Sequence, residues 1–399
     1  MPVETETTAL NKKLNIGLFV DAFLPYIDGV VMVVDNYAKH LNNLGTVYVV
    51  CPAPTDKNYK HDKPYRILNC KSLNIPIVNV NYSRPKKDKE FLKKLDALDL
   101  DIIHVHTPFA MGALGVKTAQ RKGIPLIATL HSQYKKDFKR FARLDFIVDK
   151  LLKRVMKVFN ACDEVWTFNS ACESTLYEYG YKGKCRLIPN ATDMTPVPDI
   201  GEQIEKADAE YGLAGVENVF IFVGRLYKAK NNSFSLKALA RLKERGFTNF
   251  KFLIVGAGEN ERKLRKLIKK LNLGGNVVFT GLVKDRAKLG GLLARSDLFL
   301  FPSLYDMSSL VQIEAACYKT PVLFLEGANT ASAVIDGVNG FVGPNDLQAF
   351  ANKIADVMKN RQKLKDAGER ANKDLYITWD KLAEKIYGRY TELIYEKKK

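Results

Sequence analysis

The chain has 399 residues, of which 46% are hydrophobic and 27% charged, and its formal net charge at pH 7 is +18. Because this length exceeds what a single hydrophobic core fills, we expect two domains of about 200 residues each. The composition excludes a disordered or collagen-like chain, and the charge predicts an anionic partner: a lipid surface, a nucleic acid or a phosphorylated substrate.

The six cysteines are scattered and lack the C-x-x-C or Cys/His spacing of a zinc site, which favours reduced thiols in a cytosolic protein. Residues 1–15 are polar and lack the basic and then apolar order of a signal peptide. No later stretch approaches the roughly 18 apolar residues of a membrane-spanning helix. The sequence therefore predicts a cytoplasmic protein that does not span a membrane.

Short apolar runs alternate with helical stretches through the first half of the chain. The runs expected to form buried strands are Leu14–Val20, Val47–Cys51, Ile102–Val105, Leu126–Leu130, Glu164–Phe168 and Arg186–Pro189. The alternation pauses at Ala191–Ile200, where Met194, Pro196 and Pro198 carry no periodicity, and we expect a linker there.

The second half repeats this alternation, with helices such as Ser233–Glu244 and Arg262–Leu271. Its expected strands are Val219–Val223, Phe250–Val255, Val277–Phe279, Leu298–Phe301, Pro321–Leu325 and Gly340–Val342. The pattern predicts an α/β fold of two Rossmann-like domains, residues 1–195 and 196–375, that face each other across a cleft and bind ligands at the carboxyl ends of their strands. Residues 376–399 are expected to form a C-terminal helix that can cross back to the first domain.

Gly29 follows the first predicted strand, where a helical run begins. A glycine there lets backbone N–H groups approach a phosphate, which the helix N-terminus also favours. A turn glycine without any ligand explains the residue equally well, because a single glycine is not the G-x-G-x-x-G pattern.

Arg225 and Lys230 follow the first predicted strand of the second domain, in the sequence Gly-Arg-x4-Lys-Asn (224–231). Cations at the carboxyl end of a strand could neutralise a diphosphate leaving group, which a transferase without a metal must do with side chains. The alternative is a solvated basic turn.

Gly256 and Gly258 end another predicted strand. They make half of a dinucleotide-binding pattern, but the third glycine and the acidic partner are missing. A glycine-lined cleft wall is therefore favoured over a site for NAD.

The segment Pro302–Pro321 holds two carboxylates in the spacing Asp-x7-Glu. Asp306 lies in a predicted loop and Glu314 on the following helix, which Ser308 or Ser309 can cap. The carboxylates could hold sugar and ribose hydroxyls while the helix start faces phosphate. Taken alone, this spacing is common by chance and is usually structural.

These motifs occur in one order along nearly the whole chain. The first half has Pro25-x3-Gly29-Val30, His104-Val-His106 and Thr129-x-His131; the second half has 224–231, Val-Gly-x-Gly (255–258), Phe-Thr-Gly (279–281), Phe-Pro-Ser-x2-Asp-x7-Glu-Ala (301–315) and Asn-Gly-Phe (339–341). This order resembles the retaining glycosyltransferases of family 4. The resemblance implies a GT-B fold and transfer from a nucleotide sugar without a bound metal or other cofactor.

The resemblance also implies residue roles. Arg225 and Lys230 would contact the diphosphate, Glu314 the ribose and Asp306 the donor sugar, while His131 would lie near the anomeric side of that sugar. The implied catalytic residues are His131, Arg225, Lys230 and Asp306. The other residues expected to line the donor site are Gly29, Gly256, Gly281, Ser308, Ser309, Leu310 and Glu314. His106 is equally compatible with a role in the core or in a loop.

One stretch departs from the family. Where the family has Glu-Gly-Phe-Gly, this chain has Asp306-Met-Ser-Ser309, which shortens the first carboxylate and removes both glycines beside the sugar. Asp306 keeps its acceptor oxygens and the serines keep their backbone N–H groups, so activity is expected and the identity of the donor is open. Retention without an enzyme nucleophile implies that the departing diphosphate helps to deprotonate the acceptor hydroxyl.

Residues 134–159 interleave nine Lys or Arg with large apolar side chains, and residues 84–94 carry six more cations. This composition is typical of contact with an anionic membrane surface, where Phe138, Phe141 and Leu144 could enter the headgroup zone. The residues expected to contact membrane or acceptor are Lys135, Lys136, Phe138, Lys139, Arg140, Phe141 and Arg143. A solvated helix with its apolar side in the core is the alternative.

Family members with such a basic first domain include enzymes that glucosylate diacylglycerol. The resemblance therefore favours transfer of glucose from UDP-glucose to a lipid such as 1,2-diacylglycerol, by a protein peripheral on the inner face of the cell membrane. Alternatives are a soluble, polyprenyl or polysaccharide acceptor, and a nucleotide-sugar 2-epimerase of the same architecture. A nucleic-acid-binding role rests on charge alone, without an RNP-like, helix-turn-helix or zinc pattern.

Overall fold

The computed structural model describes residues 13–56, 58–75, 80–142 and 144–399. The chain forms two compact units, one of residues 1–189 and 379–399 and the other of residues 190–378. The segment expected as a linker, Ala191–Ile200, begins inside the second unit, where the N–H of Thr192 donates to the carbonyl of Ile377 at 3.0 Å. A segment without periodicity can therefore be held by the backbone of a distant part of the chain.

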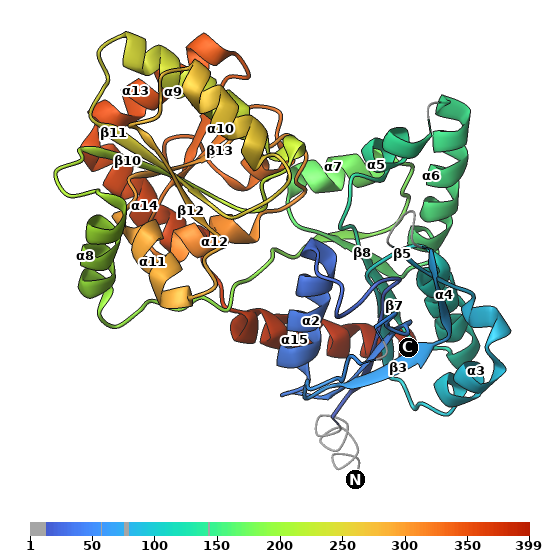
Figure 1. The fold of residues 1–399 in the computed structure, drawn as a ribbon. Coiled ribbons are helices and arrows are strands. Elements are labelled where there is room, and N and C mark those ends of the chain that lie inside the picture. Colours follow the sequence, from blue (N-terminus) through green and yellow to red (C-terminus); the bar gives the residue numbers. More distant parts are fainter. Residues whose placement is uncertain (1–12, 57, 76–79, 143) are drawn as a thin grey trace. The chain divides into compact units, whose positions relative to one another are not determined.

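The first unit is built on a seven-stranded parallel sheet (Figure 1). Its strands are β1 (Asn15–Phe19), β2 (Thr46–Pro52), β3 (Arg66–Cys70), β6 (Ile102–Val105), β7 (Leu126–Thr129), β8 (Glu164–Thr167) and β9 (Cys185–Leu187). The order across the sheet is β3-β2-β1-β6-β7-β8-β9. It reverses between β1 and β6, so the loops that follow these two strands meet at a topological switch point.

Apolar packing explains this sheet. Ile16 of β1 pairs with Val47 of β2 on one side and with Ile102 of β6 on the other, and all three side chains are fully buried. Helices cover the sheet: α2 (Gly29–Leu41), α3 (Lys89–Asp96), α4 (Ala110–Lys122), α5 (Tyr134–Phe141), α6 (Asp145–Phe159) and α7 (Ser170–Glu178). A short hairpin of β4 (Ser72–Ile75) and β5 (Val80–Ser83) and a 3-10 turn, η2 (Pro85–Lys87), complete the described part of this unit before α3.

The second unit has a six-stranded parallel sheet in the order β12-β11-β10-β13-β14-β15. Its strands are β10 (Asn218–Val223), β11 (Phe250–Val255), β12 (Val277–Gly281), β13 (Leu298–Phe301), β14 (Val322–Leu325) and β15 (Phe341–Gly343). All residues of β10 and β13 are buried, as expected of central strands covered on both faces. The order reverses between these two strands, which places the second switch point after Val223 and Phe301.

Seven helices belong to the described second unit: α8 (Ile200–Tyr211), α9 (Asn232–Glu244), α10 (Glu261–Lys270), α11 (Arg286–Arg295), α12 (Leu310–Cys317), α13 (Leu347–Lys359) and α14 (Arg361–Leu375). Two 3-10 turns, η3 (Lys228–Lys230) and η4 (Asn329–Ala333), interrupt the loops after β10 and β14. The predicted α/β fold of two Rossmann-like sheets is confirmed.

The last helix, α15 (Trp379–Lys398), is part of the first unit and lies beside α2 (Figure 1). The hydroxyl of Tyr390 lies 2.6 Å from Nδ1 of buried His104. Nη2 of Arg389 donates to Oε2 of Glu164, a nearly fully buried carboxylate, at 2.7 Å. The C-terminal helix therefore completes the core of the first unit. In the part of the chain described, no helix is long and apolar enough to cross a bilayer.

Candidate functional site

The switch point of the second unit joins two of the predicted site residues. Lys230 ends η3 after β10, and its Nζ donates to Oδ1 of Asp306 in the loop after β13 at 2.7 Å. Only 15% of each side chain is exposed. The side-chain amide of Asn231 donates to the carbonyl of Pro302 at 3.2 Å, so a second hydrogen bond joins the two loops. A cation and a carboxylate thus share one largely buried position.

Buried polar atoms without partners occur at Asp306 and at two further side chains of this unit. Oδ2 of Asp306, Oδ1 of Asn190 and Nε2 of Gln312 are buried and have no hydrogen bond to any described residue. Asn190 Nδ2 donates to Oγ of Ser308 at 3.1 Å, which brings Asn190 to the same loop. Buried polar atoms are nearly always hydrogen-bonded in native proteins. These orphaned atoms therefore point to a polar ligand that satisfies them when bound.

The loop ends at the start of α12. Ser309 is the N-cap, and its Oγ accepts from the N–H of Gln312 at 3.3 Å. Leu310 is the first helical residue, so its N–H belongs to the group that has no partner within the helix. Such a helix start favours an anion or a hydroxyl oxygen.

Glu314 lies two-thirds of the way along α12 and is held by a residue that the sequence motifs did not indicate. Its Oε1 accepts from Nη2 of Arg286 at 3.0 Å, and Arg286 also pairs with Asp193. Burial raises the pKa of Glu314, and Arg286 opposes that rise. A buried carboxylate with one countercharge is suited to accept hydrogen bonds from ligand hydroxyls.

Arg225 does not join the Lys230–Asp306 pair. Its side chain is 73% exposed, and its nearest acidic partner is Glu259, with 3.8 Å between Nη2 and Oε2. An exposed arginine at the carboxyl end of a central strand is free to move toward an anion. Its predicted contact with a diphosphate stays a prediction.

The glycines of this edge have a packing role. A Cβ on Gly256, whose φ is +129°, would lie 2.1 Å from the carbonyl oxygen of Gly224, and a Cβ on Gly258 would lie 2.3 Å from that of Leu226. The loops after β10 and β11 therefore touch backbone to backbone, which explains both glycines without a ligand. Gly281 ends β12 at φ +73°, and its carbonyl accepts from the N–H of Gly256 at 2.8 Å.

In the first unit, Gly29 is the first residue of α2, and a Cβ there would meet open space. The N-cap is Asp28, whose Oδ1 accepts from the N–H of Val31 at 2.8 Å. The helix start thus already has a carboxylate, which does not favour a phosphate at the same N–H groups. The predicted phosphate contact of Gly29 is untested.

Three histidines gather at the carboxyl ends of β6 and β7. Nδ1 of His106 lies 3.0 Å from Nε2 of half-buried His131. The ring of His104 stacks on that of His106 with 4.2 Å between centroids, and its nitrogens contact the hydroxyls of Tyr390 and Thr129. Burial lowers the pKa of His131 to about 3 and holds the pKa of the other two well below its usual range. All three rings are therefore neutral at pH 7.

Asp21, just after β1, is a partly buried carboxyl that the sequence motifs did not indicate. Its Oδ1 accepts from the N–H of Met111 at 2.8 Å, and its Oδ2 accepts from the hydroxyl of Thr107 at 2.7 Å. Burial raises its pKa to about 6, although these hydrogen bonds oppose the rise. Asp21 thus ties the loop after β1 to the start of α4.

The predicted membrane-contact residues lie on α5 and at its junction with α6. Phe141 is 83% exposed and Phe146 is 67% exposed. Leu144, which lies between them in the sequence, and Ile147, which follows Phe146, are also exposed. We call these four residues the apolar tip. Phe138, by contrast, is only half-exposed, because its ring stacks on that of Tyr134 one helical turn earlier.

The cations around the apolar tip are mostly at the surface. Lys135, Lys136, Lys139 and Arg140 are exposed on α5, and Nζ of Lys139 lies 3.1 Å from Oδ1 of Asp145 at the start of α6. Arg143, also expected to contact a membrane, lies outside the described residues.

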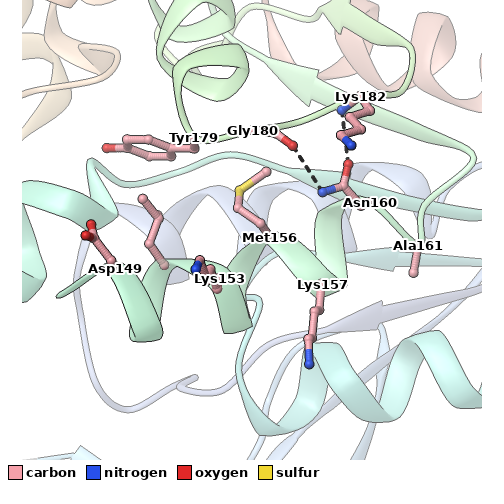
Figure 2. Close-up of a pocket in the computed structure, with 10 residues that line it drawn as sticks. Asp149, Lys153, Met156, Lys157, Asn160, Ala161, Tyr179, Gly180 and Lys182 are labelled. Atoms are coloured by element: carbon pink, nitrogen blue, oxygen red, sulfur yellow. Dashed lines mark hydrogen bonds between the residues drawn. The ribbon is translucent and has the colours of Figure 1, made fainter. Parts of the chain in front are cut away.

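A pocket of about 800 Å³ lies between α6 and the turn after α7. Its floor includes Met156, and Asn160 bridges the turn by donating to the carbonyl of Gly180 and accepting from the N–H of Lys182 (Figure 2). Lys157 points away from the ring of Tyr179, so the polar groups do not converge on one point (Figure 2). Three lysines, Lys153, Lys157 and Lys182, line the pocket, and none of its lining residues is a histidine.

The described residues contain no group of three or more His, Cys, Asp or Glu arranged to hold a metal ion. The positive charges at the switch point of the second unit come from Lys230 and Arg225. The sequence motifs missed three residues: Arg286, which pairs with Glu314, Asn190, whose amide donates to Ser308, and Gln312 on α12. Their partners are set by tertiary packing, and no motif signalled them.

Two known family models match the chain, one over most strands of the first sheet and one over those of the second. Residues 27–195 match the model described as Glycosyltransferase Family 4, and residues 203–374 match the model described as Glycosyl transferases group 1.

Two curated relatives share a name. The Alpha-monoglucosyldiacylglycerol synthase of Acholeplasma laidlawii is 27% identical, and the alignment covers 96% of each chain. The protein of the same name from Streptococcus pneumoniae is 24% identical, over 84% of this chain and 76% of its own.

Solved structures share the fold at lower identity. Sucrose-phosphate synthase from Thermosynechococcus elongatus is 21% identical with a TM-score of 0.74, covering 96% of this chain and 100% of its own. Anabaena HepE in complex with UDP-glucose is 20% identical with a TM-score of 0.72, covering 95% of this chain and 100% of its own.

Proposed function

Because the chain belongs to the GT-B glycosyltransferases, with a family 4 domain followed by a group 1 domain, we propose that it transfers glucose from UDP-glucose to a membrane lipid. The proposed acceptor is 1,2-diacylglycerol or a closely similar lipid, and the proposed outcome is retention of the anomeric configuration. The names of the two curated relatives support this choice.

The donor half of the proposal rests on the switch point of the second unit. The ammonium of Lys230 has three N–H donors. One donates to Asp306, so two remain for diphosphate oxygens. The unpartnered Oδ2 of Asp306 would accept from a sugar hydroxyl, and Glu314 from the ribose. Arg225, being exposed, would move onto the diphosphate. These charges would stabilise the departing diphosphate, which gains negative charge in the transition state.

Retention would follow from attack on the same face that the diphosphate leaves. The departing phosphate oxygen takes the proton of the acceptor hydroxyl, the new bond to the anomeric carbon forms, and the bond to the diphosphate breaks. The chain's residues position the donor and neutralise charge. Burial lowers the pKa of His131 to about 3, so its ring is neutral and is a weak base for accepting that proton.

The observation that carries the lipid acceptor is the apolar tip. Four large apolar side chains are exposed together between two helices that also present cations. Exposed aromatic and aliphatic groups next to lysines are typical of proteins that bind the surface of anionic membranes. Residues 84–94 of the same unit, which form η2 and most of α3, add the exposed cations Lys86, Lys87 and Lys93.

The activity is tested by incubating the full chain with UDP-glucose and vesicles that contain diacylglycerol and an anionic phospholipid. The expected product is α-glucosyl diacylglycerol, with its anomeric configuration read by proton NMR. A β product would refute retention. Transfer to soluble acceptors but not to vesicles would refute the lipid acceptor, and isomerisation of UDP-glucose without any acceptor would indicate a 2-epimerase.

The membrane contact is tested by vesicle sedimentation with Phe146→Ser. Losing a phenyl ring from the headgroup zone removes about 1 kcal/mol or more of binding free energy, so vesicle affinity should fall about fivefold or more. Tyr395→Ser is the matched control, because Tyr395 is 62% exposed on α15, away from the apolar tip. Equal losses in both variants would refute the apolar tip as the contact.

A further inference from the structure

His106 and His131 form a hydrogen-bonded pair of neutral rings. Nδ1 of His106 lies 3.0 Å from Nε2 of His131, so one of these nitrogens donates and the other accepts. A neutral imidazole carries one N–H and one bare nitrogen. The direction of this single hydrogen bond therefore fixes the tautomer of both rings.

The surroundings of His106 favour one direction. If His131 donated from Nε2, the proton of His106 would be on its own Nε2, which is buried and has no hydrogen-bond partner among the described residues. That arrangement buries an N–H without an acceptor. If His106 donates from Nδ1, only a bare nitrogen is left without a partner, and buried unpaired N–H groups are the rarer and costlier case.

Neighbouring rings hold His106 in this position and do not offer it another partner. His106 is fully buried, stacks on His104 and meets the ring of Tyr37 at 80° with 5.3 Å between centroids. Both nitrogens of His104 are already engaged, one with the hydroxyl of Tyr390 and one with that of Thr129. The hydrogen bond to His131 is thus the one that sets the state of His106.

We propose that His106 is a positioning residue for the transfer reaction. Its Nδ1–H donates to Nε2 of His131 and so keeps the proton of His131 on Nδ1, where His131 presents an N–H donor to a substrate oxygen. Nδ1 of His131 has no hydrogen bond to the described residues, and the ring is half-buried, which leaves this donor available to a ligand.

This assignment gives both nitrogens of His131 a role. Nε2 accepts from His106, and Nδ1 carries the proton, so neither nitrogen is left to take a proton from the acceptor hydroxyl. His131 therefore acts by donating a hydrogen bond. The use of that donor rests on the proposed function, whereas the tautomer follows from the first unit alone.

The tautomer is measured on the full chain by long-range proton–nitrogen correlation NMR with ¹⁵N-labelled histidine. The chain has five histidines, so the spectrum is sparse, and His131→Gln assigns the signals of His131. We expect protonated Nδ1 and bare Nε2 for His131. A His131 signal with the proton on Nε2 would overturn the assignment. Because this spectrum is recorded on the parent protein, the test does not depend on whether a His106 variant folds.

Kinetics test what the tautomer does. His106→Leu removes the donor to His131 and should lower kcat about tenfold, the scale of one lost hydrogen bond in the transition state, with a smaller change in KM for the donor. His106→Asn should recover most of kcat, because Nδ2 of asparagine occupies the place of histidine Nδ1. The NMR signal of His131 should become a mixture of tautomers in the Leu variant and return to one in the Asn variant.

Kinetics of the His131 and His106 variants separate a failure of the role of His106 from a failure of the proposed function. If His131→Leu leaves kcat unchanged while the parent shows the expected tautomer, the positioning role is refuted together with the use of His131 in the proposed function. If His131→Leu lowers kcat but His106→Leu changes neither kcat nor the tautomer, the role of His106 is refuted and the proposed function stands.

Discussion

Replacing Lys230 by methionine removes the charge that is shared by Asp306 and, in the proposed complex, by the diphosphate. The ammonium lies 2.7 Å from Oδ1 of Asp306, and both side chains are 15% exposed. Methionine keeps most of the side-chain volume, so the change is chiefly one of charge. Lys228→Met is the matched control, because Lys228 lies in the same turn but is exposed and makes no ion pair with a described residue.

The magnitude follows from the environment of the pair. Removing one partner of a fully buried ion pair costs about 3–5 kcal/mol, and partial exposure lowers this, so Lys230→Met should reduce the free energy of unfolding by about 2–3 kcal/mol. Asp306 would then lack a partner on both oxygens, since Oδ2 already has none among the described residues. Adding Asp306→Leu should restore part of the loss, because the orphaned carboxylate is removed as well.

Denaturant unfolding gives the stability change, and titration calorimetry with UDP gives the binding change. We expect UDP affinity to fall about tenfold or more in Lys230→Met, and kcat/KM about a hundredfold, the effect of losing one preorganised charge donor. Lys228→Met should change neither by more than about twofold. Equal UDP affinity in the parent and in Lys230→Met would refute the assignment of Lys230 to the diphosphate, whatever the effect on stability.

Three further predictions concern groups away from this pair. Burial raises the pKa of Asp21 from 3.8 to about 6, so the folded chain binds more protons between about pH 4 and 6, and stability falls as pH rises through that range. Between pH 4 and 7 the free energy of unfolding should therefore decrease by about 3 kcal/mol less in Asp21→Asn than in the parent. Parallel pH profiles of the two proteins would contradict this. Arg286→Ala leaves Glu314 buried without its cation, and denaturant unfolding should show about 1–3 kcal/mol lost at pH 8. The loss should shrink as the pH is lowered, because burial raises the pKa of Glu314 and protonation removes its unpaired charge. Gly256→Ala should lower the melting temperature strongly because its Cβ would overlap a carbonyl, whereas Gly29→Ala should leave it unchanged or slightly higher; similar shifts in both would contradict the packing argument.

Much of the fold follows from the apolar runs, and the exceptions have physical causes. The runs that became β1, β10 and β13 are fully or almost fully apolar because helices cover both faces of these strands. The edge strand β3 was not predicted, since only its last residue is buried and its exposed positions are polar. An edge strand needs less apolar surface, so its sequence carries a weaker pattern.

The candidate site was partly predictable for a topological reason. Lys230 and Asp306 follow neighbouring parallel strands, β10 and β13, so their loops had to meet at one edge of the sheet. Arg286 could not be predicted as the partner of Glu314, because it reaches across from the start of a different helix. Its role depends on how α11 and α12 pack, which spacing in the sequence does not encode.

The two phenylalanines of α5 differ in exposure. Phe138 and Phe141 were both expected at the membrane, but Phe138 packs against Tyr134 while Phe141 is open to solvent. Phe146 and Ile147, which were not named from the sequence, are exposed with Leu144 at the junction of α5 and α6. Composition indicated an interfacial segment, and only the structure shows which side chains are exposed.

The position of α15 has a consequence for synthesis of the protein. The first unit receives its last helix from the end of the chain, and His104 and Tyr37 contact that helix through Tyr390 and Trp379. Residues 190–378, in contrast, form the second unit as one continuous stretch. On the ribosome the second unit can therefore finish folding while the first still lacks part of its core, which reverses the usual N-terminal-first order. Until Trp379 and Tyr390 have been synthesised, Tyr37 and His104 lack these contacts, so this part of the first unit's core cannot be completed.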